Sequence, residues 1–280
     1  MLPPKTQIEI ADRNIAVRRL GEGPPVLALH GFPQTSACWV PLADRLGSRF
    51  EFIMPDLPGL GDSDPVSSAD MAKVGDHLIR LLDELGIQKI ALVGHDFGGA
   101  VAWSLALRHP GRISKLVVVN SPFRKLDLKR GWHMLFFNLP ILPELVFTLG
   151  GGRLVTRLIQ LASSKRLEIE TEAAEEYRRS LRTIERQRTA FDYYRTTTRA
   201  FMKSSVKKML GRGDAGPRPH IGLPTMVVWG MKDPVLPGHL LNGMERYIDD
   251  LRIERLDGVG HFVPEEAPAE LARALEDFLA

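Results

Sequence analysis

The sequence predicts a doubly wound α/β fold, in which helices cover both faces of a mostly parallel sheet. Short runs of residues that are apolar on both faces recur along the chain, as they do in strands inside a parallel sheet. Amphipathic helical patterns alternate with these runs. The alternation is interrupted once, by a long segment of helical character, which indicates a lid inserted between two strands.

The strand predictions begin with a hairpin. Gln7–Ile10 and Ile15–Leu20 alternate apolar and polar residues on either side of a polar turn. The apolar runs predict five buried strands: Val26–His30, Phe52–Met54, Ile90–Val93, Leu116–Val119 and Met226–Trp229. A further strand is expected at Leu251–Leu256.

Three helices are predicted between and after these strands. Ala69–Leu85 keeps its apolar residues three or four positions apart, and Gly86 follows as a stop signal. Phe97–Arg108 ends before a His-Pro-Gly turn, and Ala267–Leu279 closes the chain.

The interruption divides the chain into two predicted units. Residues 1–121 and 220–280 form the α/β core, and residues 122–219 form a helical cap over the carboxyl edge of the sheet. The cap is apolar and proline-containing up to Leu149, then passes through Gly150–Gly152 into long charged helices. Its basic excess mixes both charge signs, which predicts a solvated helix face rather than a nucleic-acid site.

Composition narrows the classes of function further. The chain has 280 residues, a net charge of +3 and a single cysteine, Cys38, so an internal disulfide or a multi-cysteine metal site is excluded. The first residues lack the apolar core of a signal peptide. Met134–Leu149 is too short and too interrupted for a membrane span, so we expect it to lie inside the protein or against a partner. We therefore expect a cytoplasmic protein with a small-molecule substrate; the oligomeric state stays open, with a homodimer as one option.

The strongest chemical signal lies at the end of one predicted buried strand. Gly94-His95-Asp96-Phe97-Gly98 has the pattern of a nucleophile elbow, a turn so tight that the residues two before and two after the nucleophile must be small. Asp96 occupies the position where serine or cysteine usually stands. The alternative is that Asp96 only caps the following helix, but capping would not require the flanking glycines.

A carboxylate nucleophile predicts a particular reaction. It gains little by attacking an ester or amide, but it can attack an sp3 carbon that bears a leaving group and form an alkyl ester of the enzyme. Water activated by a histidine would then attack the carbonyl carbon of Asp96 and release an alcohol.

The partners of such a nucleophile follow in the expected order. Asp233 comes just after a predicted strand, and His261 lies on a loop before the last helix, with room for one helix and one strand between them. The backbone N–H groups of Phe97 and Phe32 are the candidate oxyanion donors. We interpret His30 and His95 as structural, and the loop from Asp56 to Asp64 as turns and helix caps rather than a metal site.

These motifs resemble the α/β-hydrolase superfamily. The resemblance is carried by His30–Gln34, Asp56–Asp64, Gly94–Gly99 and the pair of Asp233 and His261. Within the superfamily the chain is most similar to the branch with an aspartate nucleophile, above all to soluble bacterial-type epoxide hydrolases, with haloalkane and fluoroacetate dehalogenases as near relatives. The resemblance implies an epoxide hydrolase that produces a vicinal diol without cofactor or metal.

The resemblance also implies a proton donor on the cap. Epoxide hydrolases protonate the leaving oxygen with two lid tyrosines or with a histidine and a tyrosine. Here Tyr194 and His133 stand at the matching positions, and the neighbouring Trp132, Phe136 and Phe137 are expected to line an apolar substrate pocket.

Two alternatives remain open. Haloalkane dehalogenases usually hold the halide with a Trp and an Asn, where this chain has Phe97 and Phe32. Fluoroacetate dehalogenases hold the substrate carboxylate with two arginines, where this chain has Phe97 and Ala100. Some dehalogenases also take the triad acid from the position that Asn120 occupies here. The pair Trp132-His133 also occurs in fluoroacetate dehalogenases, however, and Trp132 could donate to a halide. The other alternative is a ligand-binding protein that keeps the fold without turnover.

Overall fold

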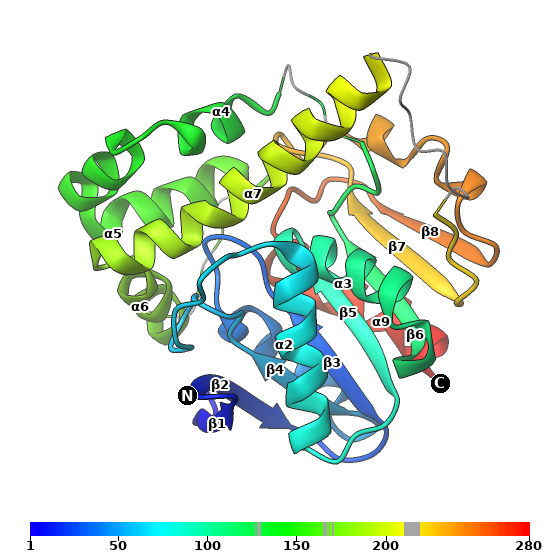
Figure 1. Ribbon diagram of the computed structural model, residues 1–280. Coiled ribbons are helices and arrows are strands. Elements are labelled where there is room, and N and C mark those ends of the chain that lie inside the picture. The colour runs from blue at the N-terminus through cyan, green and yellow to red at the C-terminus, as the bar shows by residue number, and fades with distance from the viewer. Residues whose placement is uncertain (126, 128–129, 165–166, 168, 170, 210–218) are drawn as a thin grey trace.

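The computed structural model describes residues 1–280 except 126, 128, 129, 165, 166, 168, 170 and 210–218 (Figure 1). The side chains of Trp132, Lys207 and Lys208 also lie outside the description.

Eight strands of the described chain form one sheet in the order β1-β2-β4-β3-β5-β6-β7-β8. β1 and β2 form the predicted hairpin, β2 also pairs antiparallel with β4, and all other neighbours are parallel. The sheet is therefore mostly parallel, as predicted. The strands are β1 Thr6–Ile10, β2 Arg13–Leu20, β3 Pro25–Leu29, β4 Glu51–Pro55, β5 Ile90–His95, β6 Ile113–Val119, β7 Thr225–Gly230 and β8 Leu251–Leu256.

Helices cover both faces of this sheet. α2 (Met71–Glu84) packs beside α3 (Phe97–Arg108) on one face, and α1 (Val40–Leu46) packs beside α9 (Pro268–Leu279) on the other (Figure 1). α2, α3 and α9 confirm the predicted helices. The single turn α8 (Val263–Glu266) and the short helix α1 were not predicted, because neither is long enough to display a helical period.

The connection from β7 to β8 contains two 3₁₀ helices, Gly238–Leu241 and Met244–Arg246, where the sequence left room for one helix. Gly243 between them has φ 84°, in the left-handed region, so the two turns cannot merge into one α-helix.

Between β6 and β7 the described residues form four helices, gathered over one end of the sheet (Figure 1). They are α4 (Trp132–Asn138), α5 (Leu142–Ala162), α6 (Thr171–Ser180) and α7 (Ile184–Met209). α5 bends at Gly151, whose φ of 56° and ψ of −160° are not helical. The inserted helical region is as predicted; its limits at residues 122 and 219 stay a prediction.

Buried polar contacts hold the inserted helices on the core. Glu176 of α6 accepts hydrogen bonds from Lys5 and from Arg18, whose Nη2 lies 2.7 Å from Glu176 Oε2. Tyr193 of α7 donates to the carbonyl of Pro58 at 2.9 Å. The inserted helices are therefore anchored to the core through α6 and α7.

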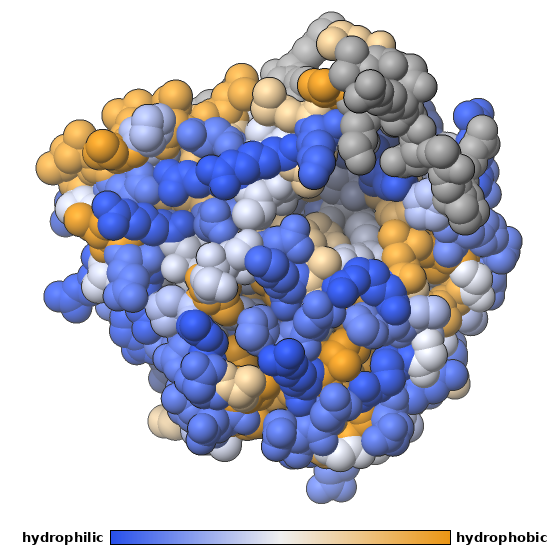
Figure 2. All heavy atoms as spheres, viewed as in Figure 1, coloured by the Kyte–Doolittle hydropathy of each residue, from blue (hydrophilic) through white to orange (hydrophobic). Residues whose placement is uncertain are grey.

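The apolar stretch Met134–Leu149 has an inner and an outer face. Met134, Phe137 and Phe147 are buried, as expected. The outer face is exposed, and Figure 2 shows apolar side chains gathered over α4 and α5 at the upper left. The exposed aliphatic residues of this face are Leu135, Leu139, Ile141, Leu142, Leu145 and Leu149. Among the described helices, none is both long and apolar enough to cross a membrane.

The close packing of α3 on the sheet generates a stability prediction. A Cβ on Gly98 would lie 2.1 Å from the backbone oxygen of Leu29, so neither group can move aside cheaply. We expect Gly98→Ala to lower the free energy of unfolding by about 2 kcal/mol or more, the usual range for overpacking. Thermal and urea unfolding measure the change.

Gly111 provides the control, because a Cβ there would meet no atom within 4 Å and its φ is not left-handed. Gly111→Ala should leave the stability unchanged or raise it slightly. Equal losses for the two variants would contradict the packing argument.

Candidate active site

The turn between β5 and α3 presents Asp96 in a strained conformation. Its φ of 50° and ψ of −118° lie in a region that side-chain-bearing residues rarely adopt. A Cβ on Gly94 would lie 2.4 Å from Gly98 O, and one on Gly31 would lie 2.4 Å from Asp96 Cβ. Asp96 makes no side-chain capping bond to α3, so helix capping does not explain its presence. The glycines therefore permit the tight turn that directs the Asp96 carboxylate towards the site.

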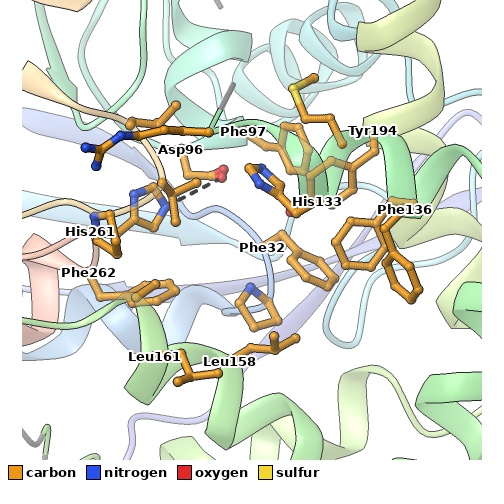
Figure 3. A pocket seen from close by; sticks show the side chains of 18 of the residues that line it. Phe32, Asp96, Phe97, His133, Phe136, Leu158, Leu161, Tyr194, His261 and Phe262 are labelled. Carbon is orange, nitrogen blue, oxygen red and sulfur yellow. Dashed lines mark ion pairs between the residues drawn. The ribbon is translucent and has the colours of Figure 1, made fainter. Parts of the chain in front are cut away.

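His261 links Asp96 to Asp233. His261 Nδ1 lies 2.7 Å from Asp233 Oδ2, and His261 Nε2 lies 4.0 Å from Asp96 Oδ2, the ion pair marked in Figure 3. Asp96 follows β5, Asp233 follows β7 and His261 follows β8. The parallel sheet therefore brings the three residues together at one edge, although they are far apart in sequence.

Asp233 is fixed from two sides. Its Oδ1 accepts hydrogen bonds from the backbone N–H groups of Val235 and Leu236, at 2.7 and 2.8 Å, and its Oδ2 accepts one from Asn120 Nδ2 at 2.6 Å. Burial opposes its ionisation, but His261 and these donors hold the pKa of Asp233 below its ordinary value. Asp233 therefore stays ionised and orients the imidazole of His261.

The charges of Asp96 and His261 depend on one another. Burial raises the pKa of Asp96 to about 6, although His261 and the backbone N–H groups of Phe97 and Phe32 work against this rise. Burial works against the His261 cation, but Asp233 and Asp96 together raise the pKa of His261 to about 9. Near neutral pH the resting site therefore contains an Asp96 carboxylate beside a His261 imidazolium.

The two candidate oxyanion donors lie on either side of Asp96. The Phe97 N–H stands at the first position of α3, and the Phe32 N–H lies in the loop that follows β3. Both N–H groups hydrogen-bond to the Asp96 carboxyl group and oppose the rise of its pKa that burial causes. They are placed to bind negative charge that develops on that carboxyl group.

These residues open into a cavity of about 550 Å³ between the sheet edge and the inserted helices. Its walls are mostly apolar and come from the core loops and from α4, α5 and α7. Of the residues singled out from the sequence, Asp96, His261, Phe32, Phe97, His133, Phe136, Phe137 and Tyr194 line it. Asp233 lies behind His261, and the side chain of Trp132 is outside the described residues.

Tyr194 and His133 face the cavity from the inserted helices (Figure 3). The Tyr194 ring stacks on Phe137 with centroids 4.3 Å apart and lies 5.9 Å from the His133 ring. Burial, with the Asp96 charge, raises the pKa of Tyr194 well above its ordinary value. Burial, with His261, lowers the pKa of His133 to about 4. Both groups are therefore uncharged near neutral pH, and Tyr194 keeps its phenolic proton.

The residues interpreted as structural have internal partners. His30 Nε2 accepts a hydrogen bond from the Leu57 N–H at 2.9 Å. Asp56 accepts one from the Ser36 N–H at 2.9 Å and another from Lys5 Nζ at 2.6 Å. His95 lies between Gln34 and the backbone carbonyl of His261.

Two contributors to the site were missed at the sequence level. Asn120, which the sequence marked only as a departure from some dehalogenases, holds Asp233 and also accepts a hydrogen bond from the Gly230 N–H at 2.9 Å. Gln34 contacts His95, the residue before Asp96, and hydrogen-bonds to Glu265. The sequence could have indicated Asn120 as a site residue, because it directly follows β6, a buried strand whose carboxyl end lies beside that of β7.

Comparisons with known proteins agree with this fold. A family model described as alpha/beta hydrolase fold matches residues 24–268. Epoxide hydrolase 3 of Xenopus tropicalis is 25% identical over 294 residues, which cover 97% of this chain and 77% of that protein. The crystal structure of ALR0039 from Nostoc sp PCC 7120 superposes with a TM-score of 0.87 at 26% identity, covering 99% of this chain and 97% of the other.

A structure described under novel epoxide hydrolases from metagenomes of hot environments superposes with a TM-score of 0.82 at 26% identity, covering 100% of this chain and 99% of the other. The match of the family model extends over most of the chain and includes the elbow, Asp233 and His261. The chain therefore belongs to the alpha/beta hydrolase fold family.

Proposed function

We propose that the protein is an epoxide hydrolase that converts an epoxide and water to a vicinal diol through an alkyl ester of Asp96. One observation carries the proposal: the Asp96 carboxylate and the protonated Tyr194 phenol line the same apolar cavity. Opening an epoxide requires a nucleophile on carbon and a proton for the leaving oxygen, and this cavity supplies both.

In the first step Asp96 attacks a ring carbon. One carboxylate oxygen forms the new C–O bond while the ring C–O bond breaks, and the leaving oxygen takes a proton from Tyr194, assisted by His133. Asp96 must be ionised to attack, so its pKa of about 6 permits the step at neutral pH. The burial that raises this pKa also removes the water that would otherwise solvate the carboxylate and weaken its attack.

In the second step His261 acts as a base. Once Asp96 is esterified its negative charge is gone, so one of the charges that raise the pKa of His261 disappears and the imidazolium can lose its proton, which restores the Tyr194 phenol. Neutral His261 then takes a proton from water as that water attacks the carbonyl carbon of Asp96. The Phe32 and Phe97 N–H groups stabilise the oxyanion. When the intermediate collapses, its new hydroxyl group gives its proton to the departing alkoxide, and the diol leaves with an oxygen that came from Asp96.

The wall of the cavity favours a hydrophobic epoxide as substrate. Phe32, Phe136 and Phe137 line it, and few polar groups other than the reacting ones face it. Relatives named epoxide hydrolases at about 25% identity support the assignment. The dehalogenase alternative would use the same triad; it receives less support, because Phe97 and Phe32 have no side-chain donor for a halide.

The ester intermediate can be trapped. His261→Gln should form the ester and fail to hydrolyse it, because glutamine cannot take a proton from water. Incubation with styrene oxide followed by intact-mass and peptide analysis should show one substrate mass added at Asp96.

The control is Asp96→Asn, which should gain no mass under the same conditions. A His261→Gln enzyme that gains no mass with any epoxide, but does so with a haloalkane or haloacetate, would replace the proposal by the dehalogenase.

The proton donors separate the two chemistries. Tyr194→Phe should slow ester formation from epoxides about 10²- to 10⁴-fold, the usual contribution of a general acid. His133→Phe should slow ester formation less than Tyr194→Phe does, because His133 only assists Tyr194. Single-turnover kinetics with excess enzyme measure both.

Tyr193→Phe is the matched control, because that hydroxyl binds the Pro58 carbonyl rather than lining the cavity. Rapid ester formation by Tyr194→Phe would show that the phenol is not the acid.

A further inference from the structure

A chain of buried polar groups leads away from the proposed active site into the core. His95 Nε2 lies 2.9 Å from the backbone oxygen of His261, and His95 Nδ1 lies 3.1 Å from Gln34 Oε1. At the other end of that amide, Gln34 Nε2 lies 2.5 Å from Glu265 Oε2. Glu265 Oε1 accepts a hydrogen bond from the Tyr177 hydroxyl at 2.9 Å. The proposed mechanism uses none of these four side chains.

The contacts of His95 restrict where its protons can be. The His261 carbonyl can only accept, so His95 Nε2 must carry a hydrogen. If His95 is neutral, Nδ1 has no hydrogen and needs a donor, so Gln34 must turn its NH₂ group towards it. If Gln34 turns its oxygen to His95 instead, both ring nitrogens must carry hydrogens and His95 must be a cation. The oxygen and nitrogen of a glutamine amide have nearly the same shape and are assigned from such a network, and a neutral His95 requires the Gln34 amide rotated by half a turn from the orientation given above.

Each arrangement fixes the state of Glu265. With the Gln34 oxygen turned to Glu265, that carboxyl group must be protonated to donate to it. With the Gln34 nitrogen turned to Glu265, the carboxyl group only accepts and needs no proton. The fully hydrogen-bonded network therefore holds a proton on Glu265 beside a neutral His95, or a second proton on His95.

The surroundings decide between the two. His95 is completely buried and faces His261 and His30 as well as Asp233; burial and His261 lower its pKa to about 3. Glu265 faces Tyr177 of α6, Cys38 and the neighbouring carboxylate of Glu266. Within the described part of the chain no lysine or arginine pairs with Glu265, and burial raises its pKa to about 7. The proton is therefore more stable on Glu265.

We propose that Glu265 is a protonated positioning residue, which donates to Gln34 and thereby directs a hydrogen-bond chain through His95 to the backbone carbonyl of His261. The backbone of His261 is then held on both sides, since its N–H donates to the Ala162 carbonyl at 3.0 Å. Protonated Glu265 thus stabilises the position of the residue that acts as base in the proposed hydrolysis, and the kinetic consequence rests on that proposed function.

Loss of the proton from Glu265 should disturb this position. As the pH rises through about 7, the carboxyl group becomes an acceptor and Gln34 must turn its nitrogen back towards it. Neutral His95 then has one hydrogen for two acceptors, so its contact with Gln34 or with His261 is lost. Ester hydrolysis should therefore slow on the alkaline side of this transition.

Glu265→Gln is the decisive variant, because a neutral amide can donate to Gln34 and accept from Tyr177 as the protonated acid does. In single-turnover kinetics we expect this variant to hydrolyse its own Asp96 ester at nearly the wild-type rate at pH 6 and to lose the alkaline decline. Glu265→Ala leaves Gln34 without a buried partner and should be slower by about ten-fold or more at every pH.

Glu266→Gln is the matched control. Glu266 lies in the same turn, but it accepts hydrogen bonds from the N–H groups of Gly260, Ser164 and Phe262, which an amide cannot all replace. It should lose activity at all pH values and keep the alkaline decline.

A direct measurement does not depend on turnover. The infrared difference spectrum of wild type minus Glu265→Gln at pH 6 should contain the carbonyl band of a protonated carboxylic acid, and the band should vanish as the pH is raised. If Glu265→Gln does not fold, a carbon-13 NMR titration of glutamate side chains in the wild type should find one carboxyl group that titrates near neutrality.

The outcomes distinguish the two proposals. A wild type that forms no ester with any epoxide refutes the proposed function, while the infrared and NMR spectra still decide the state of Glu265. Absence of a protonated carboxyl group, or an alkaline decline that persists in Glu265→Gln, overturns the assignment of Glu265.

Discussion

A buried carboxylate at the turn between β5 and α3 is the constraint on which the rest of the site depends. Asp96 has a left-handed φ, and the turn exists only because Gly94, Gly98 and Gly31 leave room where side chains would collide with backbone. An ionised group in such a place is costly unless it is paired. His261 supplies the opposite charge, and the N–H groups of Phe32 and Phe97 supply hydrogen bonds.

The same burial has opposite effects on the groups of the cavity. It raises the pKa of Asp96 and Tyr194 and lowers that of His133. The result is a nucleophile that ionises below neutral pH beside a phenol that stays protonated far above it. In the proposed function, one apolar enclosure thus prepares a nucleophile and an acid at the same time, and the inserted helices that close it contribute the acid.

The sequence predicted much of this because the signals are local. Phe97–Arg108 and Leu251–Leu256 match a helix and a strand of the structure in both bounds, since apolar periodicity and clear end signals define them. The nucleophile elbow was predicted from five consecutive residues. That Asp96, His261 and Asp233 follow three strands of one parallel sheet was enough to expect them at one edge.

The remainder depends on contacts that no local pattern reveals. The link between Gln34 and Glu265 joins residues 231 positions apart, and its meaning depends on counting hydrogens around His95. The sequence left room for one helix after Asp233, and the structure has two 3₁₀ helices there, separated at Gly243. Nor could the sequence of Met134–Leu149 show that only one face of this stretch is buried, because apolar residues lie on both its buried and its exposed face.

The central claim is that the ester which water cleaves belongs to the protein, and the origin of the transferred oxygen tests it most directly. A single turnover of an epoxide, run with enzyme in excess in water enriched in oxygen-18, should place the heavy oxygen in the side chain of Asp96, and the diol formed in that turnover should contain none. Heavy oxygen found in the diol, with Asp96 unlabelled, would contradict the account, because water would then have attacked the epoxide directly.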